Sequence, residues 1–264
     1  MDLGLRGKIA VVSGSTAGIG LAIAAALAAE GAKVVVNGRT KLRVDAALIS
    51  LQQSIPGADL RGVPADLGTA AGVEAFLRQV PAADVLVNNL GIFEPKPFLE
   101  IPDADWKRFF EVNVLSGVRL ARAYLPGMLQ KQWGRIIFIS SESAQHIPAE
   151  MNHYGMTKTA QVAVARGLAE SVAGTGVTVN SVLPGPTASE GVGGFLENMA
   201  KQQNVSTAEI EKQFFASVRP TSLLKRFETP EEVASVVAFV ASTQAVAING
   251  AAVRAEGGVV RSIF

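Results

Sequence analysis

The sequence contains no cysteine among its 264 residues. A chain without thiols forms no disulfide, offers no thiolate nucleophile and cannot build a cysteine-ligated zinc or iron–sulfur centre. Charge is also sparse, since 24 Lys and Arg stand against 23 Asp and Glu, and the basic residues are scattered along the chain. A nucleic-acid or anionic-membrane binder usually shows a basic patch, so we expect neither partner.

Long apolar runs are missing as well. No stretch reaches about 18 apolar residues, and the first residues, MDLGLRGKIAVV, lack the charged start and apolar core of a secretory signal. We therefore expect a soluble, cytoplasmic protein. Hydrophobic residues make up 48% of the chain, which fills the core of one large α/β domain or two small ones.

Short β-branched runs alternate with longer segments rich in alanine and leucine. Most of these runs lack polar–apolar alternation, which is typical of strands buried on both faces of a parallel sheet. The strand candidates are 8–13, 33–37, 59–64, 84–89, 134–140, 176–182 and 251–255. The helix candidates are 18–30, 41–53, 69–79, 103–131, 152–173 and 230–242. Without any linker between them, they predict a single doubly wound α/β domain over residues 1–264.

Three local patterns refine this outline. Thr229-Pro230-Glu231-Glu232 has the hydroxyl, proline and glutamate of a capped helix start. Pro126-Gly127 should kink or end the helix that contains it. Residues 187–222 interrupt the strand–helix alternation, and we expect a helical insertion that acts as a substrate lid, with packing or an oligomer contact as the alternatives. Phe93, Phe195, Met199 and Phe214 are candidates for an apolar pocket wall.

A glycine-rich turn follows the first strand, in the stretch VVSGSTAGIG. Gly14, Gly18 and Gly20 lie between a predicted strand and a predicted helix, where glycines let phosphates approach backbone N–H groups at the positive end of the helix dipole. The spacing Gly-x-x-x-Gly-x-Gly differs from the commoner Gly-x-Gly-x-x-Gly fingerprint, so a turn that merely joins strand to helix is the alternative.

Further motifs occur in a fixed order: NNLG at 88–91, Asn113 in VNVLSG, Ser141 in FISSES, and YGMTK with Tyr154 and Lys158. Together with the glycine-rich turn, they make the sequence resemble the short-chain dehydrogenase/reductase family in its compact single-domain form, over nearly the whole chain. The resemblance implies a Rossmann-type fold with a seven-stranded parallel sheet, a nicotinamide cofactor and hydride transfer between a carbonyl and a secondary alcohol.

The chemistry of the four motif residues is consistent with that implication. Tyr154 and Lys158 are four residues apart on a predicted helix and therefore share a face, where an ammonium would lower the high pKa of the phenol. Ser141 would hold the substrate oxygen while charge develops on it. By resemblance, Asn113 anchors a water that relays protons to Lys158, and Lys158 also binds the nicotinamide ribose.

The resemblance also assigns the cofactor contacts. They are Gly14, Ser15, Thr16, Gly18, Ile19, Gly20, Arg39, Asp66, Leu67, Asn88, Gly91, Tyr154, Lys158, Pro184, Gly185, Thr187 and Ser189. Two positions depart from the family pattern: Leu90 stands where alanine is usual, and Glu256 where aspartate is usual. Leu90 makes the assignments at Asn89 and Gly91 less firm.

Cofactor choice depends on the end of the second strand. An acid there normally binds the ribose hydroxyls and selects NAD, but this chain has Gly38 followed by Arg39, whose guanidinium suits a phosphate. We expect NADP(H), with NAD(H) as the alternative and no metal. His146 and His153 match no catalytic position, and we expect them at the pocket rim or the surface.

Three hypotheses remain at this stage. The first is an oxidoreductase whose small-molecule substrate is a 3-oxoacyl thioester, a steroid-like compound or a sugar or polyol. The second is a cofactor-binding sensor or scaffold without turnover, which intact Ser141, Tyr154 and Lys158 argue against. The third is a lyase or epimerase on the same fold. The resemblance further implies a homotetramer or homodimer.

Overall fold

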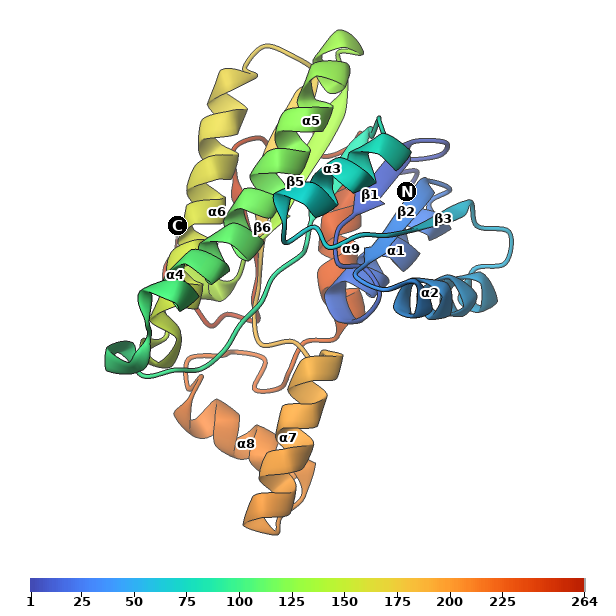
Figure 1. Ribbon diagram of the computed structural model, residues 1–264. Helices are drawn as coiled ribbons and strands as arrows, with labels where there is room; N and C mark the ends of the chain where they lie inside the picture. The colour runs from blue at the N-terminus through green and yellow to red at the C-terminus, as the bar shows by residue number, and fades with distance from the viewer. Residues whose placement is uncertain (264) are drawn as a thin grey trace.

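A computed structural model describes residues 1–263, leaving aside the side chains at 190, 191 and 195. Its centre is one sheet of seven parallel strands in the order β3-β2-β1-β4-β5-β6-β7. The strands are β1 (Ile9–Val12), β2 (Lys33–Gly38), β3 (Leu60–Pro64), β4 (Val85–Asn88), β5 (Gly134–Ile139), β6 (Val177–Pro184) and β7 (Ala252–Ala255). All seven expected strands are present, and the predicted fold class is confirmed (Figure 1).

Helices cover both faces of the sheet. The described helices are α1 (Gly18–Ala29), α2 (Lys41–Ser54), α3 (Ala70–Gln79), α4 (Asp103–Phe110), α5 (Ser116–Gln130), α6 (Asn152–Ser171), α7 (Glu190–Gln203), α8 (Thr207–Ser217) and α9 (Pro230–Ala241). Short helical turns lie at η1 (Phe98–Glu100), η3 (Glu142–Ala144) and η4 (Ala149–Met151). One core contains residues of α1, α2 and α9, and the other contains residues of α3, α5 and α6.

The strand side chains alternate between these two cores. Val34 and Val36 of β2 point into the core of α1 and α9, whereas Val35 between them points into the core of α5 and α6. Because both faces are covered, successive positions of such a strand can all be apolar, which is why the sequence shows continuous apolar runs such as Val34 to Val36. The strands therefore form a rigid layer whose carboxyl ends meet at one edge.

The helix expected over 103–131 contains a π turn, η2 (Glu111–Leu115), between α4 and α5. A π turn holds one more residue than an α-helical turn and often marks a functional position. Pro126 lies inside α5, which continues to Gln130. The helix therefore does not end at Pro126-Gly127.

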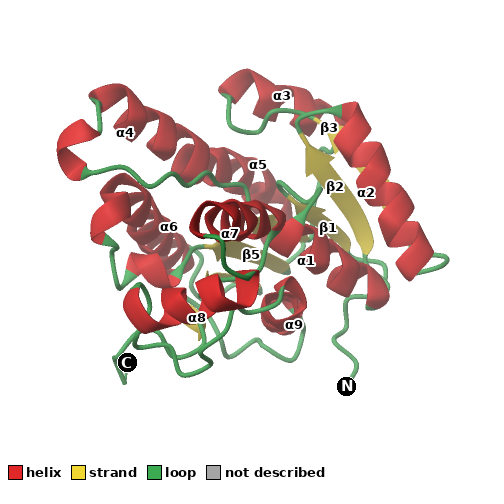
Figure 2. Cartoon of the chain, turned by 90° about the horizontal axis from the view of Figure 1, so that it is seen from below, coloured by secondary structure: helices red, strands yellow, loops and turns green. Residues whose placement is uncertain are grey.

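The segment expected as a helical insertion contains α7 and α8. In Figure 1 these two helices extend from one end of the molecule, and Figure 2 shows them in front of the sheet when the chain is seen from that end. Cβ of Ser189, at the start of α7, lies 3.3 Å from the position that a Cβ on Gly18 would take. The insertion thus begins against the glycine-rich turn.

Both ends of the chain are held by hydrogen bonds. Thr243 N, after α9, donates to Leu3 O at 3.0 Å, and the hydroxyl of Thr221 donates to Val259 O at 2.5 Å. The start of α9 has the predicted capping box, in which Thr229 and Glu232 each accept a hydrogen bond from the other's backbone N–H. None of the helices in the described part of the chain is long and apolar enough to cross a membrane.

Candidate active site

The glycine-rich turn forms a cradle at the carboxyl end of β1. Gly14 and Gly18 have φ of +61° and +54°, where residues with a Cβ are strained. A Cβ on Gly20 would collide with the side chain of Asn89 and with Gly14 O. The first turn of α1 begins at Gly18, and its N-cap, Ala17, provides no side-chain hydrogen bond. The free backbone N–H groups in the first turn of α1 can therefore bind an anion.

Ser15, predicted as a cofactor contact, is bonded to the neighbouring backbone. It is fully buried, and its hydroxyl donates to Val12 O at 2.7 Å. Asn37 N donates to that hydroxyl, and Ser15 N donates to Asn37 O. The hydroxyl and the backbone N–H of Ser15 thus hold the turn to β1 and β2. Asn37, which sequence reasoning missed, also accepts from Gly14 N at 3.2 Å.

Gly38, Thr16 and Arg39 lie together at the end of β2. A Cβ on Gly38 would come within 2.5 Å of Thr16 Cγ2, so glycine is what allows Thr16 to pack there. Arg39 is exposed and directly precedes Thr40, the N-cap of α2. An NAD-selective enzyme would carry an acid at the position of Gly38. Here that position has no charge, and the next residue, Arg39, has its guanidinium in solvent.

Asp66 and Leu67 follow β3. The carboxylate of Asp66 is exposed and accepts a hydrogen bond from Gly68 N at 3.1 Å, so part of its role is to cap its own loop. Leu67 is 1% exposed and belongs to the core that α5 and α6 cover. Its side chain is therefore taken up by the core, which leaves its backbone for the predicted cofactor contact.

The NNLG segment connects β4 to the glycine-rich turn through Asn89 rather than Asn88. Asn89 Nδ2 donates to Ser13 O and Gly14 O, each at 3.0 Å. The buried amide of Asn88 has no hydrogen-bond partner among the described residues and packs toward α5. Leu90 lies against Gly14, with its Cα 3.3 Å from where a Cβ would be. Sequence reasoning thus missed the part that Asn89 plays in holding the glycine-rich turn, and the cofactor contact at Asn88 stays a prediction.

Asn113 sits in the π turn with its side chain held on both sides. Its Oδ1 accepts from Ile92 N at 2.8 Å, and its Nδ2 donates to Thr157 Oγ1 at 3.0 Å. Its carbonyl oxygen, in the widened turn, accepts from Gln161 Nε2 at 2.7 Å. Gly91 lies between Asn113 and Lys158, since a Cβ there would be 3.6 Å from Asn113 Oδ1 and 3.5 Å from Lys158 Nζ. The structure thus brings Asn113 and Lys158 together.

The three serines at the end of β5 have different surroundings. The hydroxyl of Ser140 donates to Lys158 O at 2.8 Å, which anchors β5 to α6. The hydroxyl of Ser141 donates to the carboxylate of Glu142, and so does that of Ser143, at 2.9 Å. Ser140 and Ser143 are therefore structural, whereas the Ser141 hydroxyl lies close enough to Tyr154 to act on the pKa of its phenol.

Tyr154 and Lys158 share one face of α6, as predicted. Lys158 Nζ lies 5.5 Å from the centre of the Tyr154 ring and donates to Ile139 O at 2.9 Å. Burial lowers the pKa of Lys158 to about 8, against the effect of Glu142. Burial, and then the charge of Glu142, raise the pKa of Tyr154, while the Ser141 hydroxyl and the charge of Arg219 act in the other direction. The net pKa of Tyr154 is thus raised in the protein without cofactor or substrate, and the lowering by Lys158 stays a prediction.

The turn after β6 closes the site from the other side. A Cβ on Gly185 would come within 2.7 Å of Glu256 O and 2.9 Å of a Glu228 carboxylate oxygen. The hydroxyl of Thr187 donates to Gly185 O at 3.0 Å, so it braces the turn after Pro184. Glu256 accepts from Arg254 Nε at 2.8 Å and from two backbone amides after it. This explains the longer acid at Glu256, which reaches both the strand and the C-terminal turn.

The remaining candidates lie around this centre. His146 is exposed, but His153 is fully buried against Phe109, with ring centres 4.0 Å apart, so its expected rim or surface position is wrong. Phe93 is 54% exposed and lies edge-on to Tyr154. Phe214, on α8, packs on Phe215 of the same helix and on Phe227, which is a structural role. The side chain of Phe195 lies outside the described residues.

The fold and these motifs define a nucleotide-binding oxidoreductase, and comparison with known proteins agrees. The family model of the short chain dehydrogenases matches residues 8–200. The chain is 49% identical to the "uncharacterized oxidoreductase YvaG" of Bacillus subtilis, with both chains fully covered, and 34% identical to a D-beta-hydroxybutyrate dehydrogenase of Cupriavidus necator, covering 96% of this chain and 98% of that one. L-sorbose reductase of Gluconobacter frateurii, solved with NADPH and L-sorbose, superposes with a TM-score of 0.94 at 32% identity over both full chains.

The chain therefore belongs to the short-chain dehydrogenase family. It is an oxidoreductase that interconverts a carbonyl and a secondary alcohol with a nicotinamide cofactor.

Proposed function

We propose that this protein is an NADP(H)-dependent carbonyl reductase whose proton transfer depends on Tyr154, Ser141, Lys158 and Asn113. The observation that supports it most is the convergence of Tyr154, Ser141 and Lys158 from β5 and α6 at one buried point. A sensor or scaffold has no chemical need for such a set, so the non-catalytic alternative is not favoured.

Each residue has a distinct role in the proposed reduction. Tyr154 donates its phenolic proton to the substrate oxygen. Ser141, whose hydroxyl donates to Glu142 in the free enzyme, turns its hydrogen to that oxygen when substrate binds. Lys158, whose pKa is about 8, can gain or lose a proton near neutrality and so supplies the proton that Tyr154 loses. Asn113 positions the loop at Ile92 beside Lys158, which keeps this proton path in place.

The residues present fit the cofactor. The glycine cradle, in which a Cβ on Gly20 would collide with its neighbours, and the uncapped start of α1 would hold the pyrophosphate. The turn at Pro184 and Gly185, together with Thr187 and Ser189, would hold the nicotinamide end, and Asp66 the adenine. When bound, the cofactor supplies the hydride.

Two features at the end of β2 support NADP(H) over NAD(H). Gly38 provides no acid to repel a 2′-phosphate, and the exposed Arg39 can bind that phosphate through paired hydrogen bonds. The solved relative L-sorbose reductase carries NADPH.

A substrate panel tests the proposal. Purified protein is assayed for NADPH oxidation with sugars and polyol-derived ketones, 3-oxoacyl thioesters and steroid ketones, the three classes that the family resemblance leaves open. Tyr154→Phe should lower kcat by roughly two to four orders of magnitude, because a positioned proton donor is lost, with an unchanged Kd for NADPH. A Tyr154→Phe variant that keeps a near-normal rate would remove the phenol from the mechanism.

The wider setting follows from the same proposal. We place the enzyme in the cytoplasm, in keeping with a chain that has no cysteine. Residues 187–222 act as a substrate lid, since Ser189 already lies against the glycine-rich turn. The enzyme is expected to work as a homotetramer or homodimer, with the surfaces of α4, α5 and α6 and the edge strand β7 as its contacts.

A further inference from the structure

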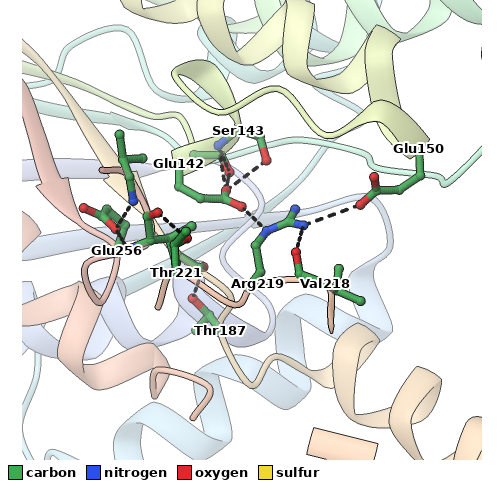
Figure 3. Close-up of polar contacts among 12 residues, drawn as sticks. Glu142, Ser143, Glu150, Thr187, Val218, Arg219, Thr221 and Glu256 are labelled. Carbon is green, nitrogen blue, oxygen red and sulfur yellow. Dashed lines mark hydrogen bonds and ion pairs between the residues drawn. The ribbon is translucent and has the colours of Figure 1, made fainter. Parts of the chain in front are cut away.

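A buried ion pair joins the insertion to the serine loop. Arg219, just after α8, donates from Nε to Glu142 Oε1 at 3.0 Å, and the two side chains are only 7% and 5% exposed. Figure 3 shows the Arg219 guanidinium between Glu142 on one side and Glu150 on the other, where the Nη1 to Glu150 Oε1 distance is 3.5 Å. Arg219 Nη1 also donates to Val218 O at 3.0 Å. These partners hold the guanidinium in one orientation.

The two carboxylate oxygens of Glu142 have separate tasks. Oε1 faces Arg219, whereas Oε2 accepts from the hydroxyl of Ser141, from Ser143 N at 2.6 Å and from Ser143 Oγ at 2.9 Å. The hydrogen of the Ser141 hydroxyl is therefore directed by a carboxylate that Arg219 holds still. Glu142 comes directly after Ser141 in the chain, so any rotation of its side chain moves the acceptor of the serine.

Stability alone is a poor explanation for this pair. Desolvating two charges costs several kcal/mol per ion, and apolar residues of similar size often serve a core equally well. Elsewhere in the same connection, Arg226 pairs with Glu232 in an exposed position, where desolvation is small. The burial of Arg219 near Ser141 is thus unusual. It also brings a positive charge close enough to Tyr154, the proposed proton donor, to affect its pKa.

We propose that Arg219 is a positioning residue, which fixes the Glu142 carboxylate and through it the hydroxyl of Ser141, so that the connection after α8 controls the geometry of the serine. The role of Ser141 toward the substrate oxygen rests on the proposed function. Arg219 itself does not contact the reacting atoms in this proposal. The insertion therefore takes part in assembling the site as well as covering it.

The first test compares kinetic constants of the wild type and five variants on a carbonyl compound that the wild type reduces. Arg219→Met should lower kcat at least tenfold while the Kd for NADPH stays within twofold. Arg219→Lys should recover part of the rate, because it restores the charge without the planar fork. Arg226→Gln is the matched control and should stay within twofold of the wild type.

Two further variants separate positioning from folding. Glu142→Gln with Arg219→Met removes both charges and should fold, since no unpaired charge remains buried. Because Arg219 acts through Glu142, the double variant should be no slower than the slower of the two single variants. Multiplicative losses, or Arg219→Met with kcat within twofold of the wild type, would overturn the proposal.

The pH dependence of kcat gives an independent test. If the pair only stabilised the fold, the two single variants would not shift this pH profile in opposite directions. Glu142 raises the pKa of Tyr154 and Arg219 lowers it, while Lys158 on α6, Glu150 on η4 and Glu228 before α9 are the other charged groups near the pair. The limb that reports Tyr154 should shift to higher pH in Arg219→Met and to lower pH in Glu142→Gln. Shifts of the same sign would contradict the proposal.

A measurement without turnover keeps the inference separate from the proposed function. The chain has two tyrosines, so labelling the ζ carbons with ¹³C gives two signals, which Tyr154→Phe assigns. The Tyr154 signal should move in Arg219→Met and stay in place in Arg226→Gln. If no panel compound is reduced, the proposed function fails, and an unmoved Tyr154 signal in Arg219→Met still overturns this inference by itself.

Discussion

The protonation state of Glu228 depends on its burial and on the charges around it. It is 4% exposed and accepts from Gly185 N at 3.2 Å. Burial, with smaller effects from nearby carboxylates, raises its pKa from 4.5 to about 7, although the Gly185 hydrogen bond acts in the other direction. The protonated form is therefore favoured in the folded state at mildly acid pH.

This gives a pH prediction with a definite sign. The stability that Glu228 contributes is present below pH 4.5, its unfolded pKa, and is lost as the pH rises through about 7, its folded pKa. Between pH 4.5 and 8, the unfolding free energy of Glu228→Gln should therefore improve relative to the wild type by roughly 1–3 kcal/mol. Urea unfolding of both proteins at pH 4.5 and pH 8 measures these free energies. If the difference between the variant and the wild type is the same at both pH values, the raised pKa of Glu228 is refuted.

A second prediction at this scale concerns Arg39. Arg39→Ala should weaken NADPH binding by roughly 1.5–3 kcal/mol, the range for a hydrogen bond to a charged group, with little effect on NADH. Dissociation constants for both cofactors, from protein fluorescence, measure it. An equal loss for the two cofactors, or a wild type that already prefers NADH, would contradict the role assigned to Arg39.

At the scale of single residues, motif spacing identified the chemistry but not the surroundings. Tyr154, Lys158, Ser141 and Asn113 were found because each lies in a short local pattern. The carboxylate of Glu142 was visible beside Ser141, but its partner Arg219 is far along the chain and has no motif of its own. The raised pKa of Tyr154 follows from burial, which a sequence pattern does not reveal.

Among the secondary-structure elements, α7 and α8 are set apart from the rest. They extend from one end of the molecule (Figures 1 and 2), and their segment contacts the body near Gly18 and through Arg219. The amides of α7 should exchange with deuterium faster than those of α9, whose apolar face lies in the core, and should slow when NADPH is added. Protection of α7 equal to that of α9 without ligand would show that it is no lid.

Element boundaries were largely readable from the sequence, with one informative exception. Apolar runs predicted all seven strands because their residues are buried on both sides. The π turn at 111–115 was missed, since apolar periodicity over 103–131 looks the same with one extra residue in a single turn. Its position at Asn113 is set by tertiary hydrogen bonds from Gln161 and to Thr157.

For the whole molecule, the edge of the sheet leads to a prediction about assembly. β7 is paired on one side only, by β6, and an unpaired strand edge is a ready site for a second chain. Sedimentation equilibrium at micromolar concentration should give a mass two or four times the 27.5 kDa of the chain. A single species at 27.5 kDa would contradict the expected homodimer or homotetramer.

The two chain ends differ in what an added peptide would disturb. Near the N-terminus, Leu3 is hydrogen-bonded to the segment after α9, on the side of the sheet where the strands begin. Near the C-terminus, Val259 is hydrogen-bonded to Thr221, which is two residues from Arg219. Leu223 N also donates to Gly257 O at 2.8 Å, which ties the same two segments a second time. A purification tag should therefore be fused to the N-terminus. A tag at the C-terminus would disturb the hydrogen bonds to the segment between α8 and α9, which contains Arg219.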